Sequence, residues 1–182
     1  MVVHDKNTIN QFETRKILQG WIDEKHVGAL VAEPQYKDMV PCVLAEELLP
    51  IPEGQKSLVD YKIWCFNGRA QYIMTCSGRE GALTKLKLFD FDWEMHQEYM
   101  VASADYPIET GEIPKPQNLE EMKVIAEKLA KPFPCVRVDL YNLEGKIYFG
   151  EMTFTSLGGM MHYYTPEFLV KCGEMIDLNY RG

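Results

Sequence analysis

Hydrophobic and polar residues alternate most regularly between positions 136 and 159, where the sequence reads VRVDLYNLEGKIYFGEMTFTSLGG. A period of two is typical of a strand that buries one face. In the first half, Arg137 and Asp139 fall on one face and apolar residues on the other. In the second half, Glu151 and Thr153 share a face in the same way. The pattern predicts two antiparallel strands, each with its polar side chains on one face.

The turn between these strands decides whether the two polar faces coincide. A two-residue loop at 144–145 would place Asp139 and Glu151 on opposite faces, because a shift of one residue in register turns a side chain over. A three-residue loop at 143–145 would instead place Arg137 opposite Glu151, with Asp139 as a diagonal neighbour. The three-residue loop is common and needs a glycine in its last position, as here. A shared polar face is therefore predicted if the three-residue loop forms.

A second alternating segment, DYKIWCFNGRAQYIM, covers residues 60–74. Asn67-Gly68 is the strongest short-range signal for a hairpin with a type I′ turn. Lys62 falls within the first strand, between Tyr61 and Ile63, where a lysine needs either a sheet edge or a functional partner. This segment predicts a second hairpin that carries one unexplained cation.

Helical spacing of apolar residues predicts three helices, from about 8 to 24, from 119 to 130 and from 166 to about 176. The apolar run at 40–49 is interpreted as a buried strand that ends in the loop PIPEG. Because the hairpins are antiparallel and the helices are separate from them, we expect an α+β fold with a mainly antiparallel sheet backed by helices.

Composition narrows the classes of protein. The 182 residues are 46% hydrophobic, so the chain can build a core. A net charge of -8 and a pI near 5.1 argue against nucleic acid and anionic membranes as partners. The five cysteines are widely spaced without a CxxC pair, which favours reduced, structural thiols. With no apolar run long enough for a membrane span and no signal peptide, we expect a cytoplasmic protein.

Two carboxylates and an arginine on one sheet face have two interpretations. They can be an ordinary solvated face in which Arg137 pairs with Glu151, which is as common as the alternative. They can also be a site for a hard cation, since Mg²⁺ prefers oxygen ligands and is typically held by one or two carboxylates together with nucleotide phosphates.

The order of these residues resembles the metal-binding hairpin of the ATP-grasp superfamily, which has R-x-D, about a dozen residues, E-x-N and a glycine-containing loop. Within that superfamily, the chain is similar to the TupA-like ATP-grasp family of bacterial surface-polysaccharide and teichuronopeptide synthesis. Thr153 stands where the broader superfamily has Asn, and its hydroxyl is a weaker metal ligand. The stretches that carry the resemblance are AEELLP, DYKIWCFNGR, FDFDW, NLEEMKVIAEKLAKPFPCVRVDLY and GKIYFGEMTFT.

The resemblance implies a role for each matching residue. Asp139 and Glu151 would bind Mg²⁺, with Thr153 as a third ligand. Arg137 would stabilise charge on the transferred phosphoryl group, and Lys62 would neutralise phosphate. Adenine contacts are implied at Glu46, Glu47, Leu48 and Leu49. Apart from the resemblance, the basic residues Arg79 and Lys85 would hold the acceptor carboxylate or nucleotide phosphates if they are functional, although they are more simply a basic surface loop. His162 is an acceptor-binding candidate if its loop faces the cleft.

The resemblance also implies an arrangement of lobes. Residues 1–49 would be the remainder of a first ATP-grasp lobe and residues 50–182 the second lobe with the metal hairpin. The pattern lacks the strand with the first nucleotide-binding lysine and the glycine-rich loop over the phosphates, so we expect an incomplete first lobe. Three explanations remain open: a fragment of a longer enzyme, a short chain completed by a partner or a second copy, and a degenerate, non-catalytic relative. With ATP and Mg²⁺, the expected activity is carboxylate–amine ligation. The alternatives are a non-catalytic binding subunit and a glycosyltransferase that holds a nucleotide sugar with the same carboxylates. The D-x-D signature usual for a glycosyltransferase is present only as Asp90-Phe91-Asp92.

Overall fold

The computed structural model describes residues 1–24, 32–55, 57–78 and 84–182. The chain divides into two compact units, Met1–Pro50 and Ile51–Gly182, and each is described by itself. The first unit contains the helix α1 (Gln11–Asp23) and the short 3-10 helices η1 (Lys6–Thr8) and η3 (Pro34–Tyr36). The helix expected from about 8 to 24 is therefore present.

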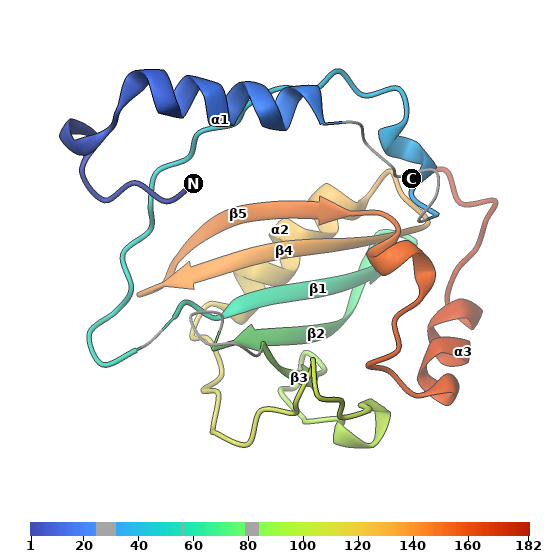
Figure 1. Ribbon diagram of the computed structural model, residues 1–182. Coiled ribbons are helices and arrows are strands. Elements are labelled where there is room, and N and C mark those ends of the chain that lie inside the picture. The colour runs from blue at the N-terminus through green and yellow to red at the C-terminus, as the bar shows by residue number, and fades with distance from the viewer. Residues whose placement is uncertain (25–31, 56, 79–83) are drawn as a thin grey trace. The chain divides into compact units, whose positions relative to one another are not determined.

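The second unit is built on a five-stranded sheet in which every pair of neighbouring strands is antiparallel (Figure 1). The strand order is β3-β2-β1-β4-β5, and the helices α2 and α3 complete the unit. The α+β fold with a mainly antiparallel sheet is thus as predicted. The bounds are β1 (Asp60–Phe66), β2 (Arg69–Ser77), β3 (Lys85–Phe89), β4 (Cys135–Leu143), β5 (Lys146–Thr153), α2 (Leu119–Ala130) and α3 (Pro166–Glu174), with short 3-10 helices η4 (Gln97–Tyr99) and η5 (Ser156–Gly159).

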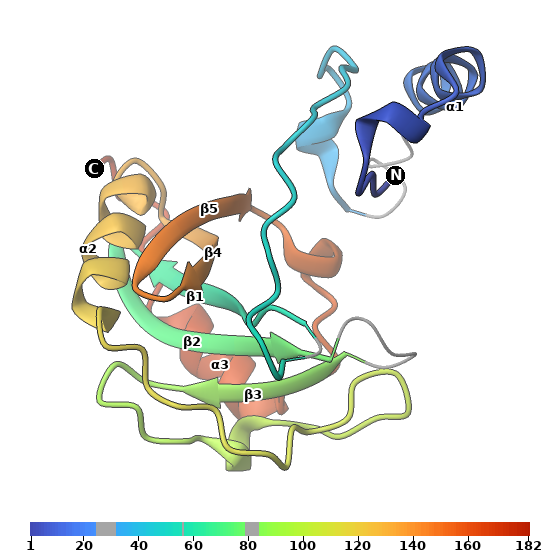
Figure 2. The ribbon, with the colours of Figure 1, turned by 90° about the vertical axis from the view of Figure 1, so that its left-hand side faces the viewer.

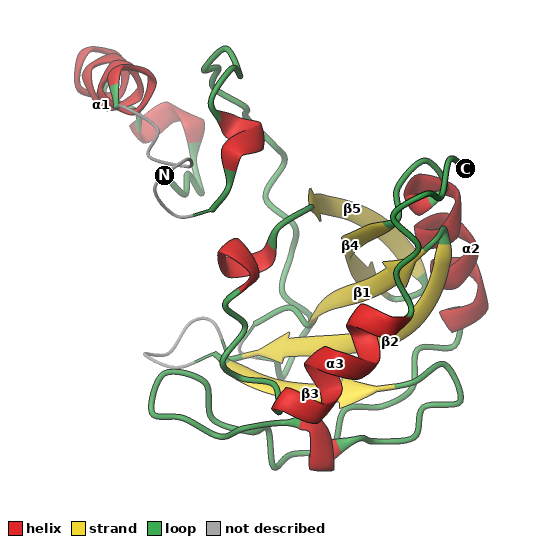
Figure 3. Cartoon of the chain, turned by 90° about the vertical axis from the view of Figure 1, so that its right-hand side faces the viewer, coloured by secondary structure: helices red, strands yellow, loops and turns green. Residues whose placement is uncertain are grey.

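Apolar side chains cover both faces of the sheet, and Figures 2 and 3 show α2 and α3 on opposite sides of it. Ile63 and its alternate neighbours on β1 pack against α2 through Met122. Trp64, on the other face, packs in a cluster with Tyr164 and with Phe168 of α3. Both core clusters are drawn wholly from the second unit. Both faces of β1 are therefore buried, which makes a lysine at position 62 still more unusual.

The β1–β2 hairpin has the predicted turn. Phe66 pairs with Arg69, and the two residues between them, Asn67 and Gly68, both have positive φ (48° and 71°), as a type I′ turn requires. A Cβ on Gly68 would also lie 2.6 Å from the hydroxyl of Tyr180. Glycine at this position avoids both the left-handed strain and a shift of the Tyr180 side chain.

The β4–β5 turn differs from the prediction. Leu143 pairs directly with Lys146, so the loop has two residues, and Glu144 (φ 50°) and Gly145 (φ 86°) both take the left-handed conformation. The three-residue loop is therefore wrong. The side chain of Asn142 accepts a hydrogen bond from the Gly145 amide at 3.1 Å, which helps to stabilise the tight turn.

A bulge in β5 restores the shared polar face. Leu140 pairs with Phe149 whereas Asp139 pairs with Glu151, so Gly150 is the extra residue on β5. A Cβ at Gly150 would lie only 3.0 Å from the backbone oxygen of Asp139, which explains a glycine there. The polar side chains do share a face, but through a bulge that the sequence analysis did not predict.

The apolar run at 40–49 is not a strand. The structure has no regular element over 41–50, and Val40 and Leu44 are 86% and 79% exposed. The first unit has no described strand with which this run could form a ladder, and an unpaired strand leaves its backbone groups without partners. Among the described residues, no helix combines the length and the hydropathy needed to cross a membrane.

Candidate nucleotide and metal site

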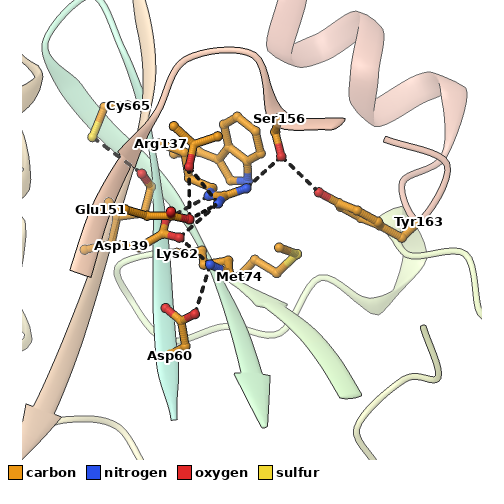
Figure 4. A network of polar contacts seen from close by, with 12 residues as sticks. Asp60, Lys62, Cys65, Met74, Arg137, Asp139, Glu151, Ser156 and Tyr163 are labelled. Carbon is orange, nitrogen blue, oxygen red and sulfur yellow. Dashed lines mark hydrogen bonds and ion pairs between the residues drawn. The ribbon is translucent and has the colours of Figure 1, made fainter. Parts of the chain in front are cut away.

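Three adjacent strands bring five of the predicted site residues together on one face of the sheet. Lys62 of β1 pairs with Asp139 of β4, which in turn pairs with Glu151 of β5. In the next row along the strands, Arg137 pairs with Thr153. Figure 4 shows the side chains of Lys62, Arg137, Asp139 and Glu151 converging, together with those of Asp60 and Ser156. We call these seven residues the polar network.

Asp139 is the centre of the polar network. Its side chain is buried, at 2% exposure. One carboxylate oxygen accepts a hydrogen bond from Nε of Arg137 at 2.7 Å, and the other accepts one from Nη2 of Arg137 at 2.9 Å and a further one from Nζ of Lys62. Two cations thus hold one carboxylate, in the bidentate geometry that arginine favours.

Arg137 is fixed by partners around its whole guanidinium group. Besides Asp139, it donates to the hydroxyl of Ser156 at 2.6 Å, to Oε1 of Glu151 at 3.2 Å and to the hydroxyl of Thr153 at 2.8 Å. Its guanidinium carbon also lies 5.8 Å from the centre of the Trp64 ring. A buried arginine with this many partners orders the groups around it and has little freedom to reach for a ligand.

Lys62 lies between two carboxylates. Its ammonium group is 2.9 Å from Oδ2 of Asp60, on the same strand, and also contacts Asp139 across the strands. The sequence analysis missed Asp60, although its position two residues before Lys62 puts both on one face of β1. That i, i+2 spacing of unlike charges in an otherwise apolar strand was the available signal.

The charges of the network stabilise one another's ionised forms. Burial alone would raise the pKa of Asp139, but the hydrogen bonds from Arg137 and the positive charges of Arg137 and Lys62 outweigh it and hold the pKa below its usual value. Burial likewise acts to lower the pKa of Lys62, and the attraction of Asp139 and Asp60 outweighs this and raises it. All three groups are therefore charged at neutral pH.

Glu151 and Thr153 form the open side of the network. The Glu151 side chain is 62% exposed, and the hydroxyl of Thr153 donates to its Oε1 at 3.3 Å. With Asp139, they supply the oxygen ligands that Mg²⁺ prefers, so the donor chemistry fits this metal. Both oxygens of Asp139 already face cations, however, and the described residues contain no ready-made group of three acidic, histidine or cysteine ligands. A divalent cation at Asp139 would therefore compete with the positive charges of Arg137 and Lys62.

The sequence analysis also missed Ser156 and Tyr163. Ser156 is buried, and its hydroxyl accepts a hydrogen bond from Arg137. The same hydroxyl lies 3.5 Å from that of Tyr163. The glycine loop that follows has three successive left-handed residues, at φ 49°, 61° and 84° for Leu157, Gly158 and Gly159. A leucine in this conformation is strained, which occurs most often near functional sites. Ser156 had no sequence signal beyond its place before the glycines.

The remaining predicted residues are not part of the polar network. Lys85 pairs with Ser77 on the face of Tyr61, opposite to that of Lys62, and its Nζ lies 3.6 Å from Glu109. It lines an open hollow of about 510 Å³, and none of the described lining residues belongs to the network. Lys85 therefore does not share a site with Asp139.

His162 is exposed, with Nδ1 3.2 Å from the backbone oxygen of Met160 and its ring beside those of Tyr106 and Tyr163. It directly precedes Tyr163, whose hydroxyl lies 3.5 Å from that of Ser156 in the network. Arg79 lies outside the described residues. The four residues predicted to bind adenine, Glu46 to Leu49, belong to the first unit, so their role stays a prediction.

Two comparisons returned nothing: the chain matches no curated protein and no solved structure. The family model described as TupA-like ATPgrasp matches residues 1–177, which is nearly the whole chain. Members of the ATP-grasp superfamily generally bind ATP with Mg²⁺, in keeping with the oxygen ligands and cations of the polar network. On the extent of this match and the resemblance of its motifs, the chain belongs to the TupA-like ATP-grasp family.

Proposed function

We propose that the polar network is the phosphate- and metal-binding part of an ATP-dependent carboxylate–amine ligase, active in the synthesis of a surface polysaccharide. The observation that carries the proposal is the row Lys62, Asp139 and Glu151 on one sheet face, flanked by Arg137. A solvated surface pair does not account for this row, since Lys62, Arg137 and Asp139 are all buried.

The proposed reaction has two steps. A carboxylate oxygen of the acceptor attacks the γ-phosphorus of ATP, ADP leaves, and an acylphosphate forms. The nitrogen of an amine then attacks the acyl carbon, inorganic phosphate leaves with the bond electrons, and the amine loses a proton, which gives an amide. A uronic acid and an amino acid are the acceptor and amine that the polysaccharide role implies.

The residues of the network would have different roles in this reaction. Asp139, Glu151 and Thr153 would hold Mg²⁺, which neutralises phosphate charge when bound. Lys62 places an ammonium group next to that position, suited to a phosphate oxygen. Arg137 keeps the Asp139 carboxylate in a fixed orientation and adds positive charge on the side where phosphoryl charge develops. In a chain with a net charge of -8, these local cations are what an anionic nucleotide requires.

Two further contacts complete the proposal. Residues 46–49 would bind adenine, with Glu46 and Glu47 at the base edge and Leu48 and Leu49 beside it. His162 is the acceptor-binding candidate adjacent to the network, through its neighbour Tyr163. The geometry gives no support to Lys85 in this role, because it lies on the other face of the sheet.

Calorimetric titration with ATP and Mg²⁺, followed by an assay of ADP release with an amino acid and a uronic acid, tests the proposal. We expect heat of binding for the wild type and its loss, at least about tenfold in affinity, in Asp139→Asn, since a charged ligand to the metal is removed. The control is Asp92→Asn, an exposed carboxylate outside the network. Absence of ATP-dependent heat in the wild type would overturn the proposal.

A non-catalytic binding subunit is the second candidate, and one observation favours it: both oxygens of Asp139 are engaged by Arg137 and Lys62. It predicts nucleotide binding without ADP release. The glycosyltransferase has less support, because Asp90 accepts hydrogen bonds from the amides of Asp92 and Glu94 and contacts His96, as a turn-stabilising residue does.

A further inference from the structure

The two cations of the polar network share one carboxylate, that of Asp139. Asp139 is shared between Arg137 and Lys62, and Lys62 in turn is shared between Asp139 and Asp60. The shared ammonium group therefore has a second carboxylate close by, on its own strand. This is the arrangement in which a cation can leave one partner without losing all of its ion pairing.

The two cations on Asp139 differ in how firmly they are held. Arg137 makes two hydrogen bonds to Asp139 and further ones to Ser156, Glu151 and Thr153, so moving it would break the whole set. Lys62 touches Asp139 with a single ammonium group at the end of a flexible four-carbon chain. If Asp139 must release one cation, Lys62 is the one that gives way.

We propose that Lys62 is an exchangeable counter-ion of the metal site, which occupies Asp139 in the free protein and moves toward Asp60 and a nucleotide phosphate when Asp139 binds a divalent cation. This inference rests on the proposed function, and it adds that metal and nucleotide bind cooperatively. Asp60 is then the residue that positions Lys62 during the exchange.

The cooperativity follows from the contacts. A divalent cation that binds alone displaces Lys62 from Asp139 and leaves it with Asp60 as its only described ion-pair partner. A phosphate oxygen supplies the missing negative partner, so nucleotide raises the affinity for metal, and metal raises the affinity for nucleotide by the same factor. The free protein consequently binds metal weakly although it has suitable oxygen ligands.

The test is titration of the full chain with Mn²⁺ alone, followed by the electron paramagnetic resonance signal of the free ion. We expect weak binding by the wild type and binding at least about tenfold tighter by Lys62→Met and Lys62→Gln, since the competing positive charge next to Asp139 is gone. Unfolding cannot produce this result, because it would weaken binding. Equal or weaker Mn²⁺ binding by the two variants would overturn the exchange.

Two controls place the effect at this site. Lys87→Met removes another buried lysine of the sheet, whose Nζ donates to Gly111 on the opposite face, and should leave Mn²⁺ binding unchanged. Asp139→Asn in the Lys62→Met background should abolish the gain. A gain that survives Asp139→Asn would also contradict the proposal.

The same variants separate this inference from the proposed function. If Lys62→Met gains Mn²⁺ affinity while the wild type shows no ADP release, the exchange stands and the ligase activity fails. If the wild type releases ADP but Lys62→Met shows no gain, the ligase activity stands and the exchange fails.

Discussion

At the scale of the residue, Asp139 is the most consequential side chain of the structure. Its carboxylate is nearly inaccessible to solvent and is held by two cations. Separating charges from water carries a large desolvation penalty, which the pairing offsets only while the set is complete. Removing one member leaves buried charges without their partner, so stability and binding depend on the same group.

Asp139→Asn should lower the free energy of unfolding by about 3 kcal/mol, since it leaves Lys62 and Arg137 with fewer negative partners in the core. Urea denaturation at pH 7 measures this, with the exposed Asp92→Asn expected within about 0.5 kcal/mol of the wild type. A loss below about 1 kcal/mol for Asp139→Asn would show that the pairing contributes little net stability.

The pH dependence has a defined sign. Because the folded pKa of Asp139 lies below its usual value, its contribution is present above the unfolded pKa of about 3.9 and is lost as pH falls through the folded pKa. The stability gap between wild type and Asp139→Asn should therefore narrow in acid, below about pH 4. A gap that stays constant from pH 7 to pH 3 would contradict this account.

His96 should give the opposite pH dependence. Partial burial acts to lower its pKa, but hydrogen bonds and attraction from Glu98 and Asp90 outweigh this and raise it. Its stabilising contribution is therefore fully present below the unfolded pKa of about 6.5 and is lost as pH rises through the raised folded pKa. The difference in unfolding free energy between wild type and His96→Gln should be larger at pH 5.5 than at pH 9. Equal differences at both values would contradict the assignment.

At the scale of the element, the β4–β5 hairpin separates what sequence can predict from what it cannot. The alternation identified both strands and put the polar residues on one side of each, because side-chain direction follows from local backbone geometry. Register is not local. It depends on the two-residue turn and on the bulge at Gly150, and each of them shifts the register by one residue from the prediction. The total shift of two residues keeps the polar side chains on the same face. Five of the seven residues of the network were thus predicted as site residues, whereas Asp60, Ser156 and the cross-strand pairs were not predicted.

The wrongly predicted strand and Ser156, a network residue that was not predicted, also depend on contacts between distant segments. The run at 40–49 has the composition of a strand, but the described residues of its unit contain no strand with which it could pair, and such partners come from the tertiary fold. Ser156 became recognisable only when Arg137 had a position in space. Residue types and strand faces were readable from the sequence, whereas contacts between distant segments were not.

Two glycines of this hairpin make a matched pair of tests. Gly150→Ala would press a Cβ against the backbone oxygen of Asp139, whereas Gly145→Ala meets nothing within 4 Å and adds only left-handed strain. We expect Gly145→Ala to destabilise by about 1 kcal/mol and Gly150→Ala by about 2 kcal/mol. In titrations with ATP and Mg²⁺, only Gly150→Ala should weaken binding, because it alone disturbs the pairing of Asp139 with Glu151. Equal effects of both variants on binding would show that the bulge does not position the carboxylates.

At the scale of the whole molecule, the two units differ in how they are built. The sheet, α2, α3 and both hydrophobic clusters lie in the second unit. The complete polar network lies there too. A self-contained core is what allows a segment to fold alone.

The fragment 51–182 should therefore fold cooperatively and retain the near-ultraviolet circular dichroism of buried Trp64. Thermal unfolding of the fragment beside the full chain measures this, and a fragment without a cooperative transition would contradict it. Its nucleotide affinity should be lower than that of the full chain, since the proposed adenine contacts at 46–49 are removed, while the Mn²⁺ gain of Lys62→Met should persist.

The bulge at Gly150 sets the register of β5, and the register decides which side chains face Asp139. Deleting Gly150 would join the two ladders into one regular ladder and leave Asp139 opposite Glu151, because Gly150 is the residue without a partner on β4. Regular pairing with Gly150 kept would instead place Asp139 opposite Gly150 and turn Glu151 and Thr153 to the other face. The deletion should therefore retain metal-dependent binding, and loss of binding would contradict this account of the register. The bulge formed by the single extra residue Gly150 therefore accounts for the position of Glu151 opposite Asp139.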